Sequence, residues 1–192
     1  MRKKIFIIEH LEPRVWKWCL MEYENISKIV GKDNLWFTNI KRHNIQLTKL
    51  GKVFREPVRD LKIDRSRVCV LDPEAKEVLR YEDNDKMDYV VFGGILGDYP
   101  PKKRTKKELT NFLEGCIVRN LGKKQMATDN AVYVVKEILE GEKFEKMKFF
   151  NKAVIQINKV ESCILPFKYV NVDGKPFMSE KVINYLKKKK GF

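Results

Sequence analysis

Cysteine and histidine are scarce in this chain. Its 192 residues include four cysteines and two histidines. Cys19, Cys69, Cys116 and Cys163 form no CxxC pair, whereas a zinc site takes its ligands in close pairs, so we expect no metal. Isolated cysteines in apolar segments are typical of buried free thiols in a reducing compartment.

Long apolar runs are also absent. No stretch approaches the roughly 18 apolar residues that cross a bilayer. The basic N-terminal residues precede an apolar run at residues 5–8, which is too short for a signal peptide. We therefore expect a cytoplasmic protein, with enough apolar residues (43%) for one sizeable core.

Negative charge is under-represented. Lys and Arg number 40 against 26 Asp and Glu, which gives a formal net charge of +14. A high content of Lys and Glu is typical of hyperthermophilic proteins, but it explains the amount of charge and not its sign. The positive excess favours a polyanionic partner, above all nucleic acid.

Short apolar segments alternate with helical patterns along most of the chain. The apolar segments predict strands at residues 5–8, 34–39, 67–73, 89–92 and 116–122. Helical patterns lie at residues 15–30, 46–52, 73–81, 128–141 and 179–190, with Thr128 or Asp129 as the expected cap of the fourth. Strands that are apolar on both faces predict an α/β fold, a parallel sheet with helices on both faces.

The pattern changes near residue 146. Alternating strand-like segments run from residue 147 to residue 172, followed by the basic helix. We expect an α/β core over residues 1–145 and a small extension over residues 146–192 that packs on it.

Glycine is scarce but concentrated. Three of the ten glycines, Gly93, Gly94 and Gly97, fall within five residues directly behind a predicted strand. We call residues 93–98 the glycine loop and residues 121–128, behind the next strand, the second loop. Such loops at the carboxyl edge of a sheet favour ligand binding, because glycine permits close backbone approach and φ > 0. The spacing is neither GxGxxG nor a Walker loop, and two ordinary tight turns remain the alternative.

Five separated motifs carry a family resemblance. They are "IIEHLE", "VCVLDP", "DYVVFGGILGDYPPKKRT", "RNLGKKQMATDNAV" and "LPFKYV", in this order across almost the whole chain. Together they resemble the small SPOUT-class methyltransferase family that includes a fungal ribosomal-protein arginine methyltransferase and archaeal predicted RNA methyltransferases. The resemblance implies a parallel sheet with a C-terminal trefoil knot, and S-adenosyl-L-methionine bound in the knot loops.

The resemblance also implies which residues bind the cofactor. They are Phe92, Gly93, Gly94, Ile95, Leu96, Gly97, Asn120, Leu121, Gly122, Gln125, Met126, Thr128 and Asp129.

An arginine acceptor needs carboxylates that orient the guanidinium and offset its charge. The catalytic candidates are Glu9 and Asp98, with His10 as a proton relay. Glu12 is a further carboxylate that can contact the acceptor. As alternatives, Glu9 caps the following helix and Asp98 only holds a turn.

Two acceptors remain open at this point. The resemblance implies methylation of an arginine of a ribosomal protein. An RNA methyltransferase is the alternative, with Arg104 and Arg119 holding phosphate, and a non-catalytic RNA- or ribosome-binding module is a third possibility. We expect a monomer, as the resemblance implies, and a dimer is the alternative.

Overall fold

The computed structural model describes residues 3–97, 99–100 and 102–188. Asp98 lies outside the described residues. Six parallel strands form one sheet in the order β3-β2-β1-β5-β4-β6. They are β1 (Ile5–His10), β2 (Leu35–Thr38), β3 (Lys52–Val53), β4 (Val68–Leu71), β5 (Tyr89–Gly94) and β6 (Ile117–Arg119).

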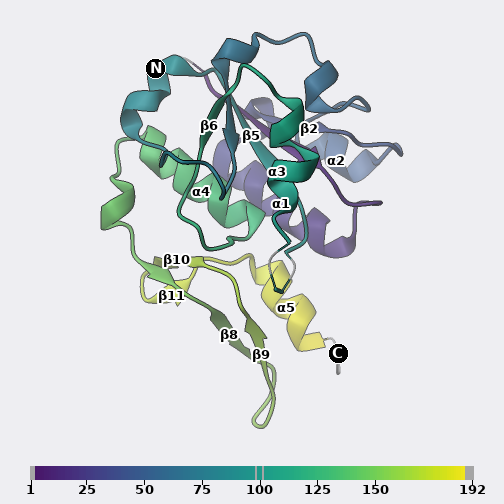
Figure 1. Cartoon of the computed structure of the whole chain (residues 1–192). Coiled ribbons are helices and arrows are strands. Elements are labelled where there is room, and N and C mark those ends of the chain that lie inside the picture. Colours follow the sequence, from purple (N-terminus) through teal and green to yellow (C-terminus); the bar gives the residue numbers. More distant parts are fainter. Residues whose placement is uncertain (1–2, 98, 101, 189–192) are drawn as a thin grey trace.

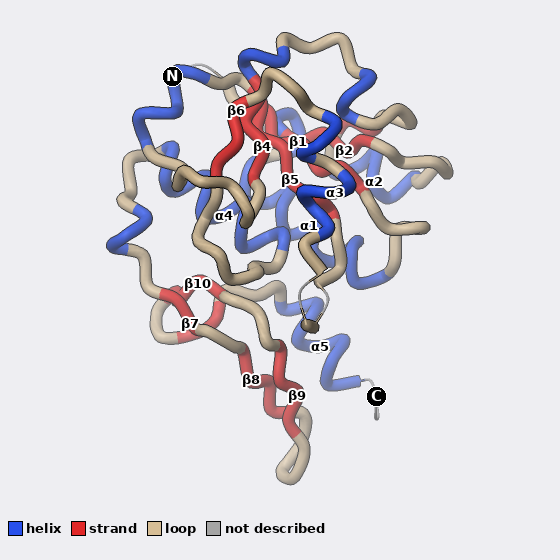
Figure 2. Tube along the Cα trace, viewed as in Figure 1, coloured by secondary structure: helices blue, strands red, loops and turns tan. Residues whose placement is uncertain are grey.

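The central strands are apolar on both faces because both faces are covered (Figures 1 and 2). On one face, Ile8 and Phe92 pack with α1 (Lys17–Val30) and α4 (Thr128–Leu139). On the other, Ile7 and Val91 pack with Leu109, which follows the short helix α3 (Arg104–Glu108). The predicted α/β fold with a parallel sheet is confirmed. The trefoil knot stays a prediction.

Most predicted elements are present. Helix α1 ends at Gly31, whose φ of 79° is readily adopted by glycine. The short helix α2 (Ile45–Leu50) begins after Asn44, whose side chain accepts hydrogen bonds from the first turn.

Two predictions about helices are wrong. Residues 73–80 form no helix, because their backbone pairs with the end of β6: Asn120 N donates to Glu77 O, and Leu79 N donates to Asn120 O. The N-cap of α4 is Ala127 and has no side-chain cap. Thr128 and Asp129 are the first two residues of the helix and are buried, and Asp129 Oδ1 accepts from Asn130 N at 2.8 Å.

The C-terminal residues form a separate layer of small elements. They comprise β7 (Phe149–Phe150), the hairpin of β8 (Ala153–Gln156) and β9 (Ser162–Leu165), β10 (Tyr169–Val172), β11 (Lys175–Pro176) and α5 (Glu180–Lys188). The hairpin projects away from the sheet, with α5 beside it (Figure 1). Met21 of α1 packs with Val182 and Leu186 of α5, so the extension has an apolar contact with the core. The division at residue 146 stays a proposal.

No helix in the described part of the chain is long and apolar enough to cross a membrane. The strands end at one edge of the sheet, where Glu9 lies opposite Gly93 and Thr38. Both loops predicted to bind a ligand begin at this carboxyl edge.

Candidate functional site

A cavity of about 430 Å³ lies at the carboxyl edge of the sheet. It is bounded by the ends of β4 and β5 and by the loop that joins β6 to α4. Eight of the residues predicted to bind a cofactor line it: Phe92, Gly93, Ile95, Leu121, Gly122, Gln125, Met126 and Thr128. The glycine loop and the second loop therefore meet around one space whose size suits a small-molecule ligand.

Two of the three clustered glycines are required by the protein's own packing. A Cβ atom on Gly94 would lie 2.5 Å from Tyr23 Oη, and one on Gly97 would lie 2.6 Å from Cε1 of Phe167. None of the three glycines has a positive φ. Gly93 lines the cavity, and Gly94 and Gly97 do not. The last two glycines are therefore needed for packing within the protein and not for contact with a ligand.

Gln125 is a polar group in the cavity that lacks a partner. Its Oε1 is buried and accepts no hydrogen bond from the described residues. Its backbone carbonyl accepts from Lys168 N at 2.9 Å, which ties the second loop to the C-terminal extension. An unpaired buried carbonyl costs about 1–3 kcal/mol, so an N–H donor that reached this atom would stabilise it.

Asn120 shapes the second loop from outside the cavity. Its Nδ2 donates to the carbonyls of Ala75 and Glu77 at 3.0 Å each, and its Oδ1 accepts from Gly122 N at 2.8 Å. Gly122 has a φ of 85°, a conformation that glycine adopts at little cost. These hydrogen bonds turn the chain so that Gly122 faces the cavity.

Glu9 lies at the end of β1 but does not line the cavity. Its Oε2 accepts hydrogen bonds from Thr38 Oγ1 and, at 2.9 Å, from Val58 N. Burial raises the pKa of this carboxyl, and both hydrogen bonds oppose the rise. The alternative that Glu9 caps the following helix is wrong. The N-cap of α1 is Trp16, and the Glu9 carboxylate accepts from Thr38 and Val58 instead.

His10 is buried behind the glycine loop. Its Nδ1 lies 2.8 Å from Tyr23 Oη, and burial lowers the pKa of its imidazole. It lies opposite Gly94 and outside the lining of the cavity.

Glu12 and Arg104, both predicted to bind substrate, bind each other. Arg104 Nη1 donates to Glu12 Oε1 at 2.7 Å, and its Nη2 donates to the carbonyl of Leu11 at 2.9 Å. The same Glu12 oxygen accepts from Leu96 N at 3.1 Å. Hydrogen bonds to Glu108 and Glu12 raise the pKa of Arg104. Through Leu96 and Arg104, these hydrogen bonds hold both ends of the loop between β5 and α3 against the residues that follow β1.

Arg119 is likewise engaged within the protein. Its Nε and Nη2 donate to the two carboxylate oxygens of Asp83 at 2.9 and 3.0 Å, and Glu77 lies 3.1 Å from Nη2. Its side chain is 15% exposed and does not line the cavity.

The sequence reasoning missed the carboxylates that do line the cavity, Asp72 and Glu74. Asp72 is buried and accepts from Thr110 Oγ1 at 2.6 Å and from Glu74 N at 2.9 Å. Glu74 pairs with Lys103 at 2.9 Å, and this contact lowers the pKa of its carboxyl. The available signal is the position of Asp72 directly behind a buried strand, but an Asp-Pro pair there is equally typical of a strand that simply ends.

A second pair of carboxyls, Glu22 of α1 and Asp129 of α4, is buried outside the lining of the cavity. Burial and, after it, the nearby charge of Asp129 raise the pKa of Glu22 to about 8. Trp18 Nε1 donates to Glu22 at 2.7 Å, and Asn25 Nδ2 donates to Asp129 at 2.9 Å. Asp129 therefore supports the start of α4 and does not line the cavity.

Comparisons with known proteins agree over nearly the whole chain. A family model described as "Protein arginine N-methyltransferase SFM1-like" matches residues 5–191. The chain is 38% identical to protein arginine N-methyltransferase SFM1 of Saccharomyces cerevisiae, over 95% of this chain and 94% of that protein.

Solved structures show the same fold. The yeast SFM1 structure in complex with SAM has a TM-score of 0.89 and 37% identity, and covers 98% of this chain and 91% of its own. The complex of yeast SFM1 with SAH has a TM-score of 0.88 and 36% identity, with coverage of 95% and 94%. The structure of a dual-specific Trm10 from Thermococcus kodakaraensis, 22% identical over 74% of this chain and 96% of its own, has a TM-score of 0.56 and shares the fold.

Proposed function

The chain belongs to the SFM1-like family of protein arginine N-methyltransferases, and from this premise we propose that it methylates an arginine of a ribosomal protein with S-adenosyl-L-methionine. The observation that carries the proposal is the cavity between the glycine loop and the second loop, at the carboxyl edge of the sheet. Family membership favours a protein acceptor over RNA, and catalysis over a binding module. The ribosomal acceptor follows from the family resemblance and places the enzyme in the cytoplasm.

The residues in the cavity fit the cofactor. Phe92, Ile95 and Met126 offer apolar contact for a flat ring, and the unpaired Oε1 of Gln125 accepts a hydrogen bond from its N–H. S-adenosyl-L-methionine supplies a methyl group on a sulfonium that is its own leaving group. The chain therefore has mainly to hold the acceptor nitrogen about 3–3.5 Å from that methyl group.

Glu74 is the carboxylate that receives the acceptor guanidinium in this proposal, and Asp72 holds the backbone of Glu74 beside it. Both line the cavity, and Lys103 already forms an ion pair with Glu74 at 2.9 Å. We propose that the acceptor arginine replaces Lys103 there, because a guanidinium binds a carboxylate through two parallel hydrogen bonds. The nitrogen loses its proton during or after attack, and Glu74 or Asp98 accepts it.

The other predicted site residues act as supports in this proposal. Glu9 holds the ends of β2 and of the Val58 segment through its two hydrogen bonds. His10 fixes Tyr23 behind Gly94, and Glu12 holds Leu96 through its backbone N–H. Their loss would act through the shape of the cavity.

Labelled cofactor and native small ribosomal subunits test the function. After separate digestions, we expect label that protease releases and RNase does not, recovered as methylarginine on hydrolysis. Glu74→Gln should lower turnover by about 10²–10³, the scale for one preorganised electrostatic contact. The exposed Glu142→Gln is the matched control and should keep wild-type turnover. Label recovered in RNA would contradict the proposal.

A further inference from the structure

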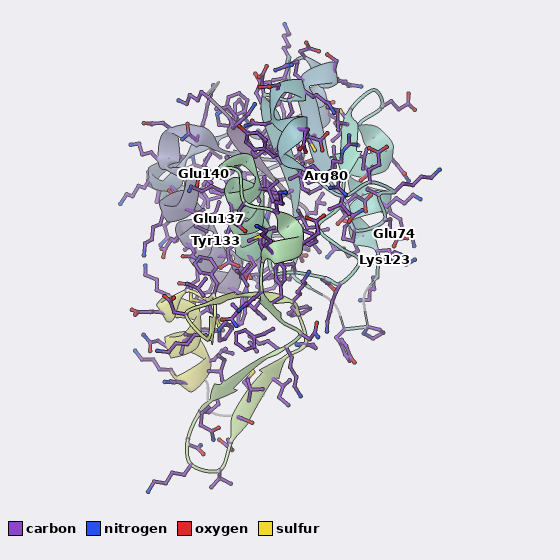
Figure 3. All side chains as sticks on the ribbon, turned by 90° about the vertical axis from the view of Figure 1, so that its left-hand side faces the viewer. Glu74, Arg80, Lys123, Tyr133, Glu137 and Glu140 are labelled. Carbon is purple, nitrogen blue, oxygen red and sulfur yellow. The ribbon has the colours of Figure 1, made fainter. Side chains whose placement is uncertain are left out.

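Six exposed lysines gather around the mouth of the cavity. They belong to residues 102–107, at the start of α3, and to the second loop. We call them the cationic rim: Lys102, Lys103, Lys106, Lys107, Lys123 and Lys124. Four of them line the cavity itself. The two segments converge on Glu74, whose pKa is lowered by Lys103, Lys106 and Lys123 together, and Figure 3 shows Glu74 and Lys123 on the same side of the molecule.

Four of the six lysines of the rim lack a carboxylate partner among the residues that the structure describes. Lys103 pairs with Glu74. Lys106, Lys107, Lys123 and Lys124 have no carboxylate within 4.0 Å among the residues that the structure describes. A cluster of exposed positive charges at the mouth of a site raises the local concentration of an anionic ligand.

The acceptor side chain does not explain this charge. An arginine is a cation and is repelled by the rim, and a free ribosomal protein is itself basic, as is this chain at +14. The cofactor offers a single carboxylate, which one or two cations neutralise. Six lysines on two neighbouring segments instead match a row of phosphates, which cations contact independently of base sequence.

We propose that the cationic rim binds the phosphate backbone of RNA next to the acceptor arginine, so that the enzyme acts on a ribosomal protein already assembled on its RNA. This inference rests on the proposed function, because it concerns the surface around the same site. The RNA neutralises the repulsion between enzyme and acceptor and brings the arginine to the mouth of the cavity.

The test compares intact small subunits with RNA-free protein prepared from the same subunits. KM should be lower for subunits, and it should rise steeply between about 50 and 200 mM salt, since each phosphate contact contributes about 0.7–0.9 to the log–log slope. Lys106→Gln with Lys107→Gln should raise KM for subunits and reduce that slope by about 1–2. Both residues lie outside the cavity lining, so SAH affinity should be kept.

The matched control removes the same charge elsewhere. Lys187→Gln with Lys188→Gln, at the end of α5, should leave the slope unchanged. Equal KM values for subunits and RNA-free protein, or the same loss of slope in both double variants, would overturn the rim proposal and leave the proposed function standing. If neither acceptor is methylated, the proposed function fails. The rim proposal is then tested separately by the binding of a duplex RNA oligonucleotide. If the double variant Lys106→Gln with Lys107→Gln bound this RNA as tightly as the wild type, the rim proposal would be overturned.

Discussion

At the scale of single residues, the side chains best suited to a substrate are already engaged, and Gln125 is the lining residue with an unpaired buried atom among the described residues. Glu12, Arg104 and Arg119 have side chains suited to a substrate, yet each is engaged by other residues of the chain. Gln125 has a buried Oε1 that no described residue satisfies. The free-energy cost of this unsatisfied acceptor is offset only when a hydrogen-bond donor binds to it.

Gln125→Met should therefore have effects of opposite sign on binding and stability. Losing the acceptor should weaken SAH binding about fivefold or more, since one net hydrogen bond is worth about 1 kcal/mol. Removing an unsatisfied buried carbonyl should raise the Tm of the free protein by about 2–4 °C per kcal/mol. Calorimetry and thermal unfolding measure the two effects. The exposed Gln46→Met is the control, and unchanged SAH affinity in Gln125→Met would refute the assignment.

Glu22 should make stability fall as the pH rises from about 4.5 to about 8. Burial raises its folded pKa to about 8, above the ordinary value of 4.5. A raised pKa means that the folded state holds the proton more tightly, so this stabilisation is full below about pH 4.5 and is lost as pH rises through about 8. The loss is at most about 1.4 kcal/mol per pH unit. Tm measured across this range should decline in the wild type and stay flatter in Glu22→Gln; parallel curves would contradict the prediction.

At the scale of elements, the end of β5 is held against α1 by a contact that leaves no room for a side chain. Tyr23 of α1 approaches Gly94 through its hydroxyl, which also bonds His10. The glycine loop therefore depends on the packing of a helix that is remote from it in sequence. A substitution at Gly94 tests this packing before it tests the ligand.

Gly94→Ala should lower the free energy of unfolding by about 1–3 kcal/mol, the usual cost of overpacking a core. The added methyl would meet Tyr23 Oη at 2.5 Å and Ile8 Cγ2 at 2.9 Å. Tyr23→Phe removes the nearer atom, so Gly94→Ala should cost less in that background, with an interaction energy of about 0.5–3 kcal/mol. Urea unfolding of the four proteins measures the cycle, and strictly additive costs would show that the hydroxyl is not the obstacle.

At the scale of the whole molecule, the C-terminal extension covers part of the core. Met21 of α1 packs with Val182 and Leu186, and Trp18 meets Tyr185 edge-on at 6.3 Å between ring centroids. The extension also reaches the site, since Phe167 packs against Gly97 and Lys168 N donates to the carbonyl of Gln125. The chain thus supplies from itself a cover for α1 and a wall behind the second loop.

This cover predicts a monomer. An apolar helix face that is already packed offers little surface for a second copy. The sedimentation coefficient should stay constant as protein concentration rises from low to high micromolar values. A dimer at all concentrations would contradict the prediction, and a concentration-dependent one would indicate association through another surface.

Local patterns in the sequence are enough to predict the parallel sheet, the order of most elements and the edge at which the loops gather. They suffice because apolar strands and amphipathic helices are encoded by neighbouring residues. The same local reasoning predicts a helix at residues 73–81 that does not form, since nothing nearby shows that this backbone pairs with Asn120.

Which polar groups reach the cavity depends on the folded chain. Glu9 turns to Thr38 and Val58 and does not line the cavity. Arg104 lines it but is held by Glu12, and Asp72 and Glu74 also line it. Except for Asp72 and Glu74, the partners lie far apart along the chain, so no spacing in the sequence shows that they meet. The physical reason is that a buried charge goes to the groups that satisfy its hydrogen bonds, and folding alone determines which groups those are.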